Sequence, residues 1–239
     1  ASGSSTARLS AARLSAAVDI DPDLLAVGAG EARIIVQARP GQIAQAQREI
    51  ESLGGAMSKP LAIVNGFSAT LPAERVRELS SLRSVAVVTL DREVTMAGST
   101  DSEPQKSVYR KVLRADDVER AGYTGRGVTV ALIDTGVADV ADLSGRVLPV
   151  YNDITETWSA CANFTGEDCS DSYGHGTVMA GIIAGSGADS AANAAGAYTG
   201  VAPKTHVVAV KVAGRNGAVD VSTMLQAMHW VAAYKDQFN

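Results

Sequence analysis

The sequence is poor in cysteine, in aromatic residues and in long apolar runs. It has two cysteines and 5% aromatic residues among its 239 positions. A membrane-spanning helix needs about 20 predominantly apolar residues in succession, and the sequence contains no such stretch. Charged residues interrupt the Ala- and Ser-rich start of the chain at Arg8, Arg13, Asp19, Asp21 and Asp23. We therefore expect no membrane span, and a chain from which any secretory signal peptide has already been removed.

Basic residues are not in excess either. The sequence has 21 Lys and Arg against 26 Asp and Glu, a formal net charge of -5. Nucleic-acid binding needs clustered basic side chains on one face, so this balance argues against it. The densest basic group, Arg110, Lys111 and Arg114, is interpreted as a solvated helix face. With 46% hydrophobic and 20% charged residues, the composition is that of a soluble globular protein long enough for two small domains.

The two cysteines lie close together in the sequence. Cys161 and Cys169 belong to a polar segment with loop composition, SACANFTGEDCSD. Neither has a second Cys or a His at the spacing of zinc ligands. Two unrelated thiols are one interpretation, but a pair of cysteines in one loop is typical of proteins from oxidising compartments. We therefore expect a disulfide between Cys161 and Cys169.

Apolar periodicity divides the first part of the chain. Residues 1–29 show no sustained period and are interpreted as a flexible leader. Residues 30–96 predict the order β-α-β-β-α-β, a ferredoxin-like α+β unit with its own small core. Strands are expected at 33–38, near 56–60, at 61–71 with an interruption at Asn65-Gly66, and at 84–90, and helices after Pro40-Gly41 and from Pro72. Ile63 is expected on the apolar side of the strand at 61–71, and Val76 and Leu79 on the apolar face of the second helix.

The second part of the chain follows a polar segment. Residues 91–107 contain Gly, Ser and Pro without a period, and we place a linker at 97–107. Residues 108–239 alternate strands and helices, which favours a parallel α/β sheet. Strands are expected at 127–134, 146–151 and 206–212, and helices at 177–185 and after Asp220. Met224 and Met228 in the last helix are interpreted as core residues.

Two short motifs carry chemistry. Asp134-Thr135-Gly136 stands where an apolar strand ends, which is where open α/β sheets present functional groups. Gly174-His175-Gly176-Thr177 places a histidine between glycines at the start of a helix. In a serine hydrolase a histidine takes and returns the serine proton while a carboxylate orients the imidazole. Asp134 and His175 suit these two roles.

Either motif alone has simpler explanations. An Asp-Thr-Gly at a strand end can be a turn, and a histidine between glycines can be an ordinary loop residue. Asp-Thr-Gly also occurs in aspartic proteases, whose two acids share one proton. Those enzymes are built from β-strands, whereas this motif lies between a strand and a helix and precedes Gly-His-Gly-Thr.

Together the motifs resemble the subtilisin family of serine proteases. The similar segments are GYTGRGVTVALIDTGV (122–137), GHGT (174–177) followed by Ala180-Gly181, and GVAPKTHVVAVKV (200–212), in the order of the family. Residues 31–94 resemble the family's propeptide, a ferredoxin-like domain that assists folding and inhibits the enzyme until it is cleaved off. The resemblance covers residues 31–239 and implies a secreted serine endopeptidase precursor that needs no cofactor for its chemistry.

The resemblance also implies roles for individual residues. Asp134 corresponds to the triad aspartate and His175 to the triad histidine. Gly217, Ala218 and Val219 correspond to the segment that pairs with the substrate backbone as an added strand. Asp142, with Gln105 as a second oxygen ligand, corresponds to a structural calcium site. The partners implied are a protein or peptide substrate and the protein's own propeptide, with maturation between Thr95 and Gln105 or, as a second possibility, at Arg110-Lys111.

The sequence departs from the family at several places. Val178-Met179 replaces a common His-Val, which we expect to change packing only. The loop at 138–141 is short, which weakens the expectation of calcium. The sequence contains no oxyanion-hole asparagine segment and no Gly-Thr-Ser nucleophile, so residues 108–239 are interpreted as an incomplete catalytic domain, inactive alone. A different hypothesis is a non-catalytic inhibitor or folding assistant that acts through residues 30–96.

Overall fold

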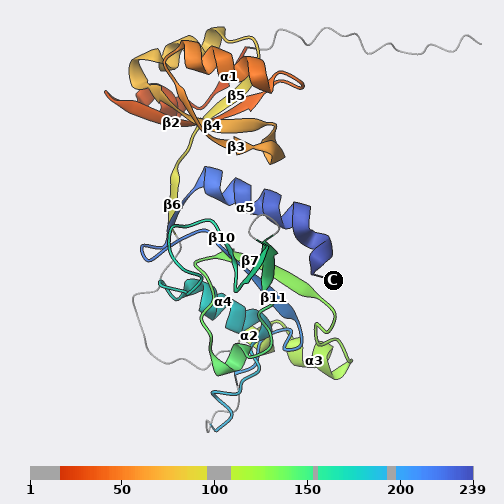
Figure 1. The fold of residues 1–239 in the computed structure, drawn as a ribbon. Helices are drawn as coiled ribbons and strands as arrows, with labels where there is room; N and C mark the ends of the chain where they lie inside the picture. Colours follow the sequence, from red (N-terminus) through yellow and green to blue (C-terminus); the bar gives the residue numbers. More distant parts are fainter. Residues whose placement is uncertain (1–16, 96–108, 153–155, 193–197, 239) are drawn as a thin grey trace, which may run out of the picture. The chain divides into compact units, whose positions relative to one another are not determined.

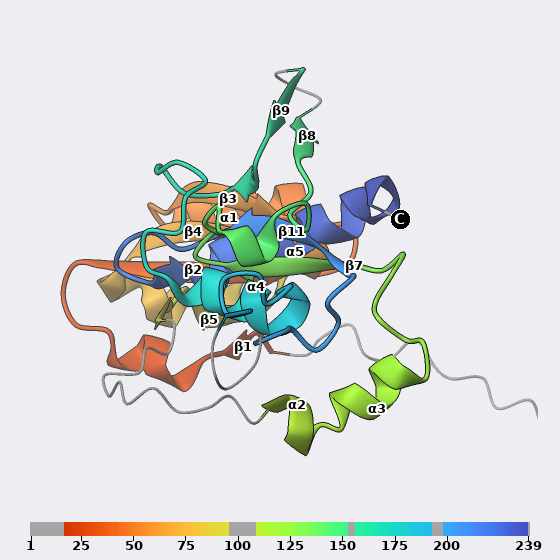
Figure 2. The ribbon, with the colours of Figure 1, turned by 90° about the horizontal axis from the view of Figure 1, so that it is seen from below.

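The computed structural model describes residues 17–95, 109–152, 156–192 and 198–238 (Figures 1 and 2). The chain divides into two compact units, Ala1–Asp91 (unit 1) and Arg92–Asn239 (unit 2). Within these residues no helix combines the length and the hydropathy that crossing a bilayer requires.

Unit 1 is built around a five-stranded sheet with the strand order β1-β5-β2-β4-β3. Its strand β2 is antiparallel to both of its neighbours, β4 and β5, and the short β1 runs parallel to β5. In chain order the elements are β1 (Asp19–Ile20), the 3-10 helix η1 (Pro22–Ala26), β2 (Glu31–Ala38), α1 (Ile43–Ser52), β3 (Ala56–Leu61), η2 (Ala62–Val64), β4 (Gly66–Pro72), η3 (Ala73–Ser81) and β5 (Val85–Leu90).

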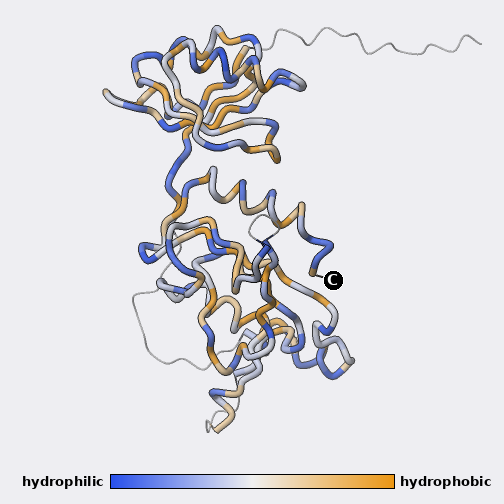
Figure 3. Tube along the Cα trace, in the orientation of Figure 1, coloured by the Kyte–Doolittle hydropathy of each residue, from blue (hydrophilic) through white to orange (hydrophobic). Residues whose placement is uncertain are grey.

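The core of unit 1 lies between this sheet and its helices. Apolar residues follow the strands in Figure 3, and Ile34 and Val36 of β2 are fully buried. Helix α1 contributes Ala46 and Ile50, which the helical period places on one face. Burying a side chain such as Ile50 stabilises the fold by about 1.5–3 kcal/mol relative to leaving it exposed.

Residues 17–29 differ from the predicted leader. Asp19 and Ile20 pair with Val87 and Val88 of β5, and the side chain of Leu24 is 1% exposed. A two-residue strand and one turn of 3-10 helix are too short to produce a period, which is why the pattern predicted no structure there. The described part of the predicted leader therefore belongs to unit 1.

Two other predictions in unit 1 need correction. The strand expected at 61–71 is interrupted next to Asn65-Gly66 as predicted, and Asn65 adopts the left-handed conformation (φ 51°), but residues 62–64 form the 3-10 helix η2 instead of extended strand. Ile63, predicted to face the core, is 44% exposed. The helix expected from Pro72 is the 3-10 helix η3, although it buries Val76 and Leu79 as predicted.

Unit 2 contains a three-stranded parallel sheet with the order β10-β11-β7, which makes it an α/β structure. Two antiparallel pairs, β8-β9 and β6-β12, accompany this sheet. In chain order the elements are β6 (Glu93–Thr95), α2 (Tyr109–Val112), α3 (Ala115–Arg120), β7 (Thr129–Asp134), η4 (Ala141–Leu143), β8 (Val150–Asn152), β9 (Thr157–Ser159), β10 (Ala162–Asn163), α4 (His175–Ala184), β11 (His206–Lys211), β12 (Ala218–Asp220), α5 (Val221–Tyr234) and η5 (Lys235–Gln237).

Helices α4 and α5 pack on opposite faces of the parallel sheet (Figure 1). Val208 and Val210 of β11 join the cluster that contains α5, whereas Val207 joins the cluster that contains α4. A strand covered on both faces has apolar residues at successive positions rather than at alternate ones. This explains the continuous run HVVAVKV and places the carboxyl ends of β7 and β11 at one edge.

Several predictions for unit 2 need correction. The strand expected at 146–151 is mostly loop: Val147 makes a single parallel bridge to Val207, and β8 begins only at Val150. Arg110 is not a solvated residue, because its guanidinium pairs with Asp116 and Glu119 and its side chain is 15% exposed.

One of the two methionines in the last helix also differs from expectation. Met228 of α5 is 45% exposed, whereas Met224 packs against the cluster that contains Ala227 and the β11 valines, as predicted. The first compact unit ends at Asp91, and β6, which lies within the predicted domain 30–96, pairs with β12 of unit 2.

Candidate active site

Asp134 and His175 meet at the carboxyl end of the parallel sheet. Asp134 is the last residue of β7 and is 5% exposed, and His175 is the first residue of α4. The His175 Nδ1 atom lies 2.8 Å from Asp134 Oδ1 and 2.9 Å from Oδ2. The His175 side chain retains 27% of its exposure. A buried carboxylate thus holds one ring nitrogen of a histidine that remains accessible to solvent.

Two glycines allow these residues to approach. Gly136 has φ 107°, a conformation that residues with a Cβ rarely adopt, and it turns the chain directly after Asp134. A Cβ on Gly176 would lie 2.1 Å from the Gly136 carbonyl oxygen and 3.2 Å from Asp134 Oδ1. The glycines of the two motifs therefore pack against each other, and a side chain at Gly176 would collide with the backbone of Gly136.

Thr135 links the two motifs through hydrogen bonds. Its backbone N–H donates to Asp134 Oδ1 at 2.7 Å, and its Oγ1 accepts the N–H of Gly176 at 2.9 Å. The Thr135 hydroxyl donates to Asp171 Oδ1 at 2.7 Å, a shorter contact than its 3.2 Å separation from Asp134 Oδ1. The carboxylate of Asp134 is thus oriented by the residue that also holds the first turn of α4.

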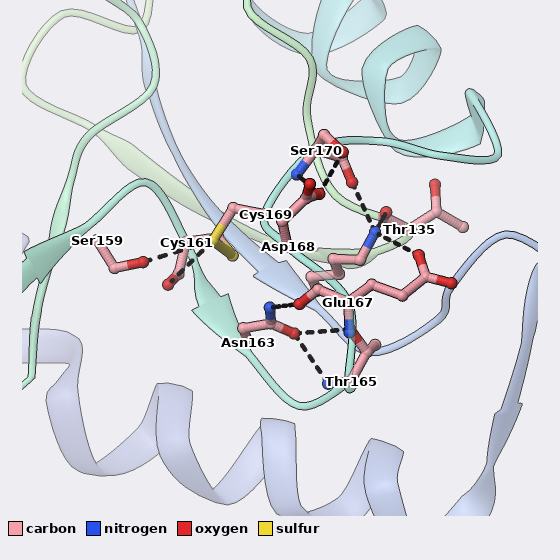
Figure 4. Close-up of a disulfide and its surroundings, with 10 residues drawn as sticks. Thr135, Ser159, Cys161, Asn163, Thr165, Glu167, Asp168, Cys169 and Ser170 are labelled. Carbon is pink, nitrogen blue, oxygen red and sulfur yellow. Dashed lines mark hydrogen bonds and ion pairs between the residues drawn. A yellow bond between two sulfur atoms is a disulfide. The ribbon is translucent and has the colours of Figure 1, made fainter.

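Cys161 and Cys169 are joined by a disulfide in the structure (Figure 4). The disulfide joins the residue before β10 to the loop at 164–174, which leads toward α4 and is called the disulfide loop below. Glu167 in this loop accepts the N–H of Arg215 at 3.1 Å and the hydroxyl of Ser172 at 2.7 Å. The loop therefore contacts the segment that precedes β12.

Lys211 lies beneath the same loop. It is fully buried at the end of β11, directly opposite Asp134 in the strand register. Its Nζ donates to the carbonyl oxygens of Thr135, at 2.9 Å, and of Ser170, at 2.6 Å, and lies 3.6 Å from Glu167 Oε2. The Lys211 side chain thus connects the turn that follows Asp134 (residues 135–138, called the Asp134 turn) to the disulfide loop.

The expected substrate segment includes β12. Gly217 lies in the turn before β12 with φ 66°. A Cβ atom on Gly217 would lie 2.7 Å from the ring of Tyr173, so this position has room only for glycine. Ala218 and Val219 pair antiparallel with Thr95 and Val94 of β6. A strand from earlier in the chain thus occupies the edge at which the sequence predicted an added strand.

Asp142, the predicted calcium ligand, lies in the 3-10 helix η4. Its Oδ1 accepts the N–H of Asp189 at 2.8 Å, and its carbonyl oxygen accepts the N–H of Ser186. Calcium takes about six to eight oxygen ligands. The described ranges contain no group of three His, Cys, Asp or Glu side chains that could hold a metal ion, and Gln105 lies outside these ranges. We therefore derive no step through calcium.

Two residues of the site were not found from the sequence. Asp171 contacts both motifs but lies outside the three segments that resemble the family, and Lys211, which holds the turn after Asp134, lies in the segment 200–212 without a predicted role. Asp171 lies only four positions before His175, so an acidic residue close to Gly-His-Gly-Thr is the pattern that could have identified it.

Comparison with known proteins identifies the second unit. Residues 125–238 match the model of the subtilase family, "Peptidase_S8: Subtilase family", and this range contains Asp134 and His175. The chain is similar to serine protease AprX of Bacillus subtilis (strain 168), with 32% identity over 66% of this chain and 31% of the relative. It is also similar to alkaline serine exoprotease A of Vibrio alginolyticus, with 26% identity over 92% of this chain and 41% of the relative.

A solved structure shows the same fold. Fervidolysin from Fervidobacterium pennivorans, described as a keratinolytic enzyme related to subtilisin, matches with a TM-score of 0.57 and 18% identity. The match covers 91% of this chain and 36% of fervidolysin. The chain thus spans about a third to two fifths of the length of these proteins. Residues 125–238, which are 114 of the 239 positions, thus form a subtilase-family domain.

Proposed function

We propose that this chain contributes the aspartate and the histidine of an Asp-His-Ser triad to a serine endopeptidase. The observation that supports this proposal is the contact of His175 Nδ1 with both oxygens of the buried Asp134 carboxylate. The carboxylate accepts the Nδ1–H, which assigns Nε2 as the nitrogen that takes the proton of an attacking hydroxyl. The carboxylate also stabilises the imidazolium that forms in that step.

The nucleophile of this proposal lies outside the sequence. The 239 residues contain no Gly-Thr-Ser, and we propose that the serine belongs to a further part of the same protein. It would attack the scissile carbonyl and form an acyl-enzyme that water then hydrolyses. The 239-residue chain alone would hold the histidine in place but would supply no nucleophilic serine for it to activate.

The unit that precedes the catalytic residues is proposed to be a propeptide of ferredoxin-like type. Its element order from β2 to β5 is β-α-β-β, a 3-10 helix and β, and these four strands have the order β5-β2-β4-β3 in the sheet. Strand β6, which follows, pairs with β12 where a substrate strand would add. We propose that β6 occupies the substrate edge as a cleaved product would, and so inhibits the enzyme.

The disulfide supports a secreted protein, because disulfides persist in oxidising compartments and are rare elsewhere. The proposed substrates are therefore extracellular proteins or peptides, bound mainly through their backbone along β12. Maturation is proposed between Thr95 and Gln105, of which residues 96–105 lie outside the described ranges.

The experiment that tests this function compares the 239-residue chain with the full-length protein on a chromogenic peptide. The full-length protein should hydrolyse the peptide, and His175→Ala should abolish hydrolysis. His229→Ala, which removes an exposed histidine from α5, is the matched control and should retain activity. Hydrolysis by the 239-residue chain that depends on His175 would contradict the missing serine. Full activity of His175→Ala would contradict the triad.

A further inference from the structure

The carboxylate of Asp171 accepts five hydrogen bonds between the two motifs. Asp171 lies in the loop between Cys169 and α4 and uses both of its oxygens. Oδ1 accepts from the Thr135 hydroxyl at 2.7 Å, from Gly174 N–H at 2.7 Å and from Tyr173 N–H at 3.2 Å. Oδ2 accepts from Thr177 N–H at 2.7 Å and from the Thr177 hydroxyl at 2.5 Å.

These contacts hold both ends of the Asp134 turn, residues 135–138, which directly follows Asp134. One end is Thr135, whose N–H binds the Asp134 carboxylate. The other end is Ala138, whose N–H donates to Thr177 Oγ1 at 3.0 Å while the Thr177 hydroxyl donates to Asp171. The Asp171 carboxylate thus holds the Asp134 turn at two points. It contacts Thr135 directly, and it holds Ala138 through the hydroxyl of Thr177.

The same carboxylate also holds the start of the helix that carries His175. The N-cap position of α4 is Gly174, which has no side chain to accept the free N–H groups of the first turn. Asp171 accepts the N–H groups of Gly174 and Thr177 instead. A negative charge is favourable at the N-terminus of a helix. Burial alone would raise the pKa of Asp171, but the hydrogen bonds from Thr177, Gly174 and Thr135 outweigh it and lower this pKa.

We propose that Asp171 is a positioning residue that sets the Asp134 turn and the first turn of α4 in register, so that His175 Nδ1 meets the Asp134 carboxylate. The catalytic consequence rests on the proposed protease function, whereas the positioning itself is a property of this chain. A residue that only capped the helix would need no contact with Thr135, yet the Thr135 hydroxyl donates to Asp171 across 36 positions of sequence.

The substitution that tests this proposal is Asp171→Asn. An asparagine has one oxygen and one NH2 group, so either the Thr177 N–H or the Gly174 N–H must face a donor instead of an acceptor. The side chain keeps its size while the two-sided clamp is lost. The matched control is Asp168→Asn, three positions earlier in the same loop, because Asp168 accepts hydrogen bonds from Ser170 and lies in the exposed part of the loop.

The first measurement uses the 239-residue chain and needs no activity. Ring nitrogen shifts of the neutral histidine, read through the carbon-bound ring protons, report which nitrogen carries the proton, and His175→Ala assigns the resonances. The original chain and Asp168→Asn should show His175 with its proton on Nδ1, as the Asp134 contact requires. Asp171→Asn should shift the ring toward the Nε2–H form. An unchanged Nδ1–H population in a folded Asp171→Asn chain would overturn the proposal.

A second pair of variants covers the case in which Asp171→Asn fails to fold. Thr177→Val removes only the hydroxyl that joins Asp171 to Ala138, and Thr177→Ser restores a hydroxyl. The tautomer shift should appear in Thr177→Val and be reversed in Thr177→Ser. An equal Nδ1–H population in both variants would overturn the proposal.

Kinetics of the full-length protein separate this proposal from the protease function. A misplaced catalytic pair lowers the rate of the chemical step more than substrate binding, so Asp171→Asn should reduce kcat by about 10- to 100-fold. KM should change by less than about twofold, because none of the five hydrogen bonds of Asp171 is made with β12. A rise in KM with unchanged kcat would overturn the positioning role. An inactive original protein with the tautomer shift intact would refute the protease function and leave the positioning supported.

Discussion

Lys211 lies directly beneath Thr135: its Nζ donates to the Thr135 carbonyl oxygen at 2.9 Å from a side chain with no exposed surface. The same ammonium group donates to the carbonyl oxygen of Ser170 in the disulfide loop. Fully buried lysines are rare, because a charge removed from water must be compensated by partners. The two carbonyl groups and Glu167 supply this compensation, so Lys211 ties the Asp134 turn to the loop that precedes α4.

Lys211→Met should therefore destabilise unit 2. The methionine fills similar space but leaves the Thr135 and Ser170 carbonyl groups without their buried donor, which should cost about 3 kcal/mol. Both tryptophans, Trp158 and Trp230, lie in unit 2, so tryptophan fluorescence during urea unfolding reports this unit. Lys235→Met, at an exposed lysine of η5, is the control and should change the stability by less than about 0.5 kcal/mol. Equal effects of the two substitutions would contradict the role of Lys211.

The disulfide should be complete and should stabilise unit 2. Thiol titration of the unfolded, unreduced chain should find no free thiol, and two reactive thiols would disprove the pairing. Replacing both Cys161 and Cys169 by Ser should lower the free energy of unfolding by about 2–3 kcal/mol, because the reduced chain regains the entropy of a short loop. Tryptophan fluorescence should give the same loss for the original chain in reductant.

The sequence singled out Asp134 and His175, which the structure places in contact, but it predicted only part of their surroundings. Asp134 and His175 were found because each lies in a short motif whose glycines are required by close packing, as Gly176 shows. The role of Lys211 depends on a contact across 76 positions of sequence, which no local pattern records. For the strand expected at 61–71, the sequence predicted the interruption at Asn65-Gly66 but not the 3-10 helix at Ala62–Val64 before it. The alternation of apolar residues continues through a 3-10 turn that ends in the left-handed Asn65.

The stability of unit 2 should depend on the ionisation of Asp171. The pKa of this carboxyl is lowered in the folded chain, so its contribution is fully present above the unfolded value of about 4 and is lost as the pH falls through the folded value. The difference in free energy of unfolding between the original chain and Asp171→Asn should therefore be largest near neutral pH and shrink below about pH 4. Urea unfolding followed by tryptophan fluorescence at a series of pH values measures it. A difference that is constant with pH would contradict this assignment.

Maturation of the full-length protein should cut between Thr95 and Gln105 rather than at Arg110-Lys111. A protease needs an extended and accessible backbone, whereas Arg110 lies in α2 with its guanidinium paired to Asp116 and Glu119. N-terminal sequencing of the mature enzyme decides between the two sites. A mature chain that begins directly after Lys111 would show that this ion-paired helix is the site of cleavage.

The segment 17–96 expressed alone should inhibit the full-length enzyme more strongly than the segment 30–96. Both contain the β6 strand that pairs with β12, but only the longer one retains Leu24, which is 1% exposed in the core of unit 1. Losing the burial of Leu24 should cost about 1.5–3 kcal/mol, a large share of the stability of a domain this small. A less stable inhibitor spends more of its binding energy on folding, so its inhibition constant should be higher.

Inhibition of peptide hydrolysis and thermal unfolding of each segment test this prediction together. The control is Val94→Asp in the segment 17–96, which places a charge in the strand that pairs with Val219 and leaves the core of unit 1 intact. It should weaken inhibition without lowering the unfolding temperature. Equal inhibition by the two segments despite a difference in stability would show that residues 17–29 have no part in the inhibitor. No inhibition by either segment at micromolar concentration would contradict the propeptide role.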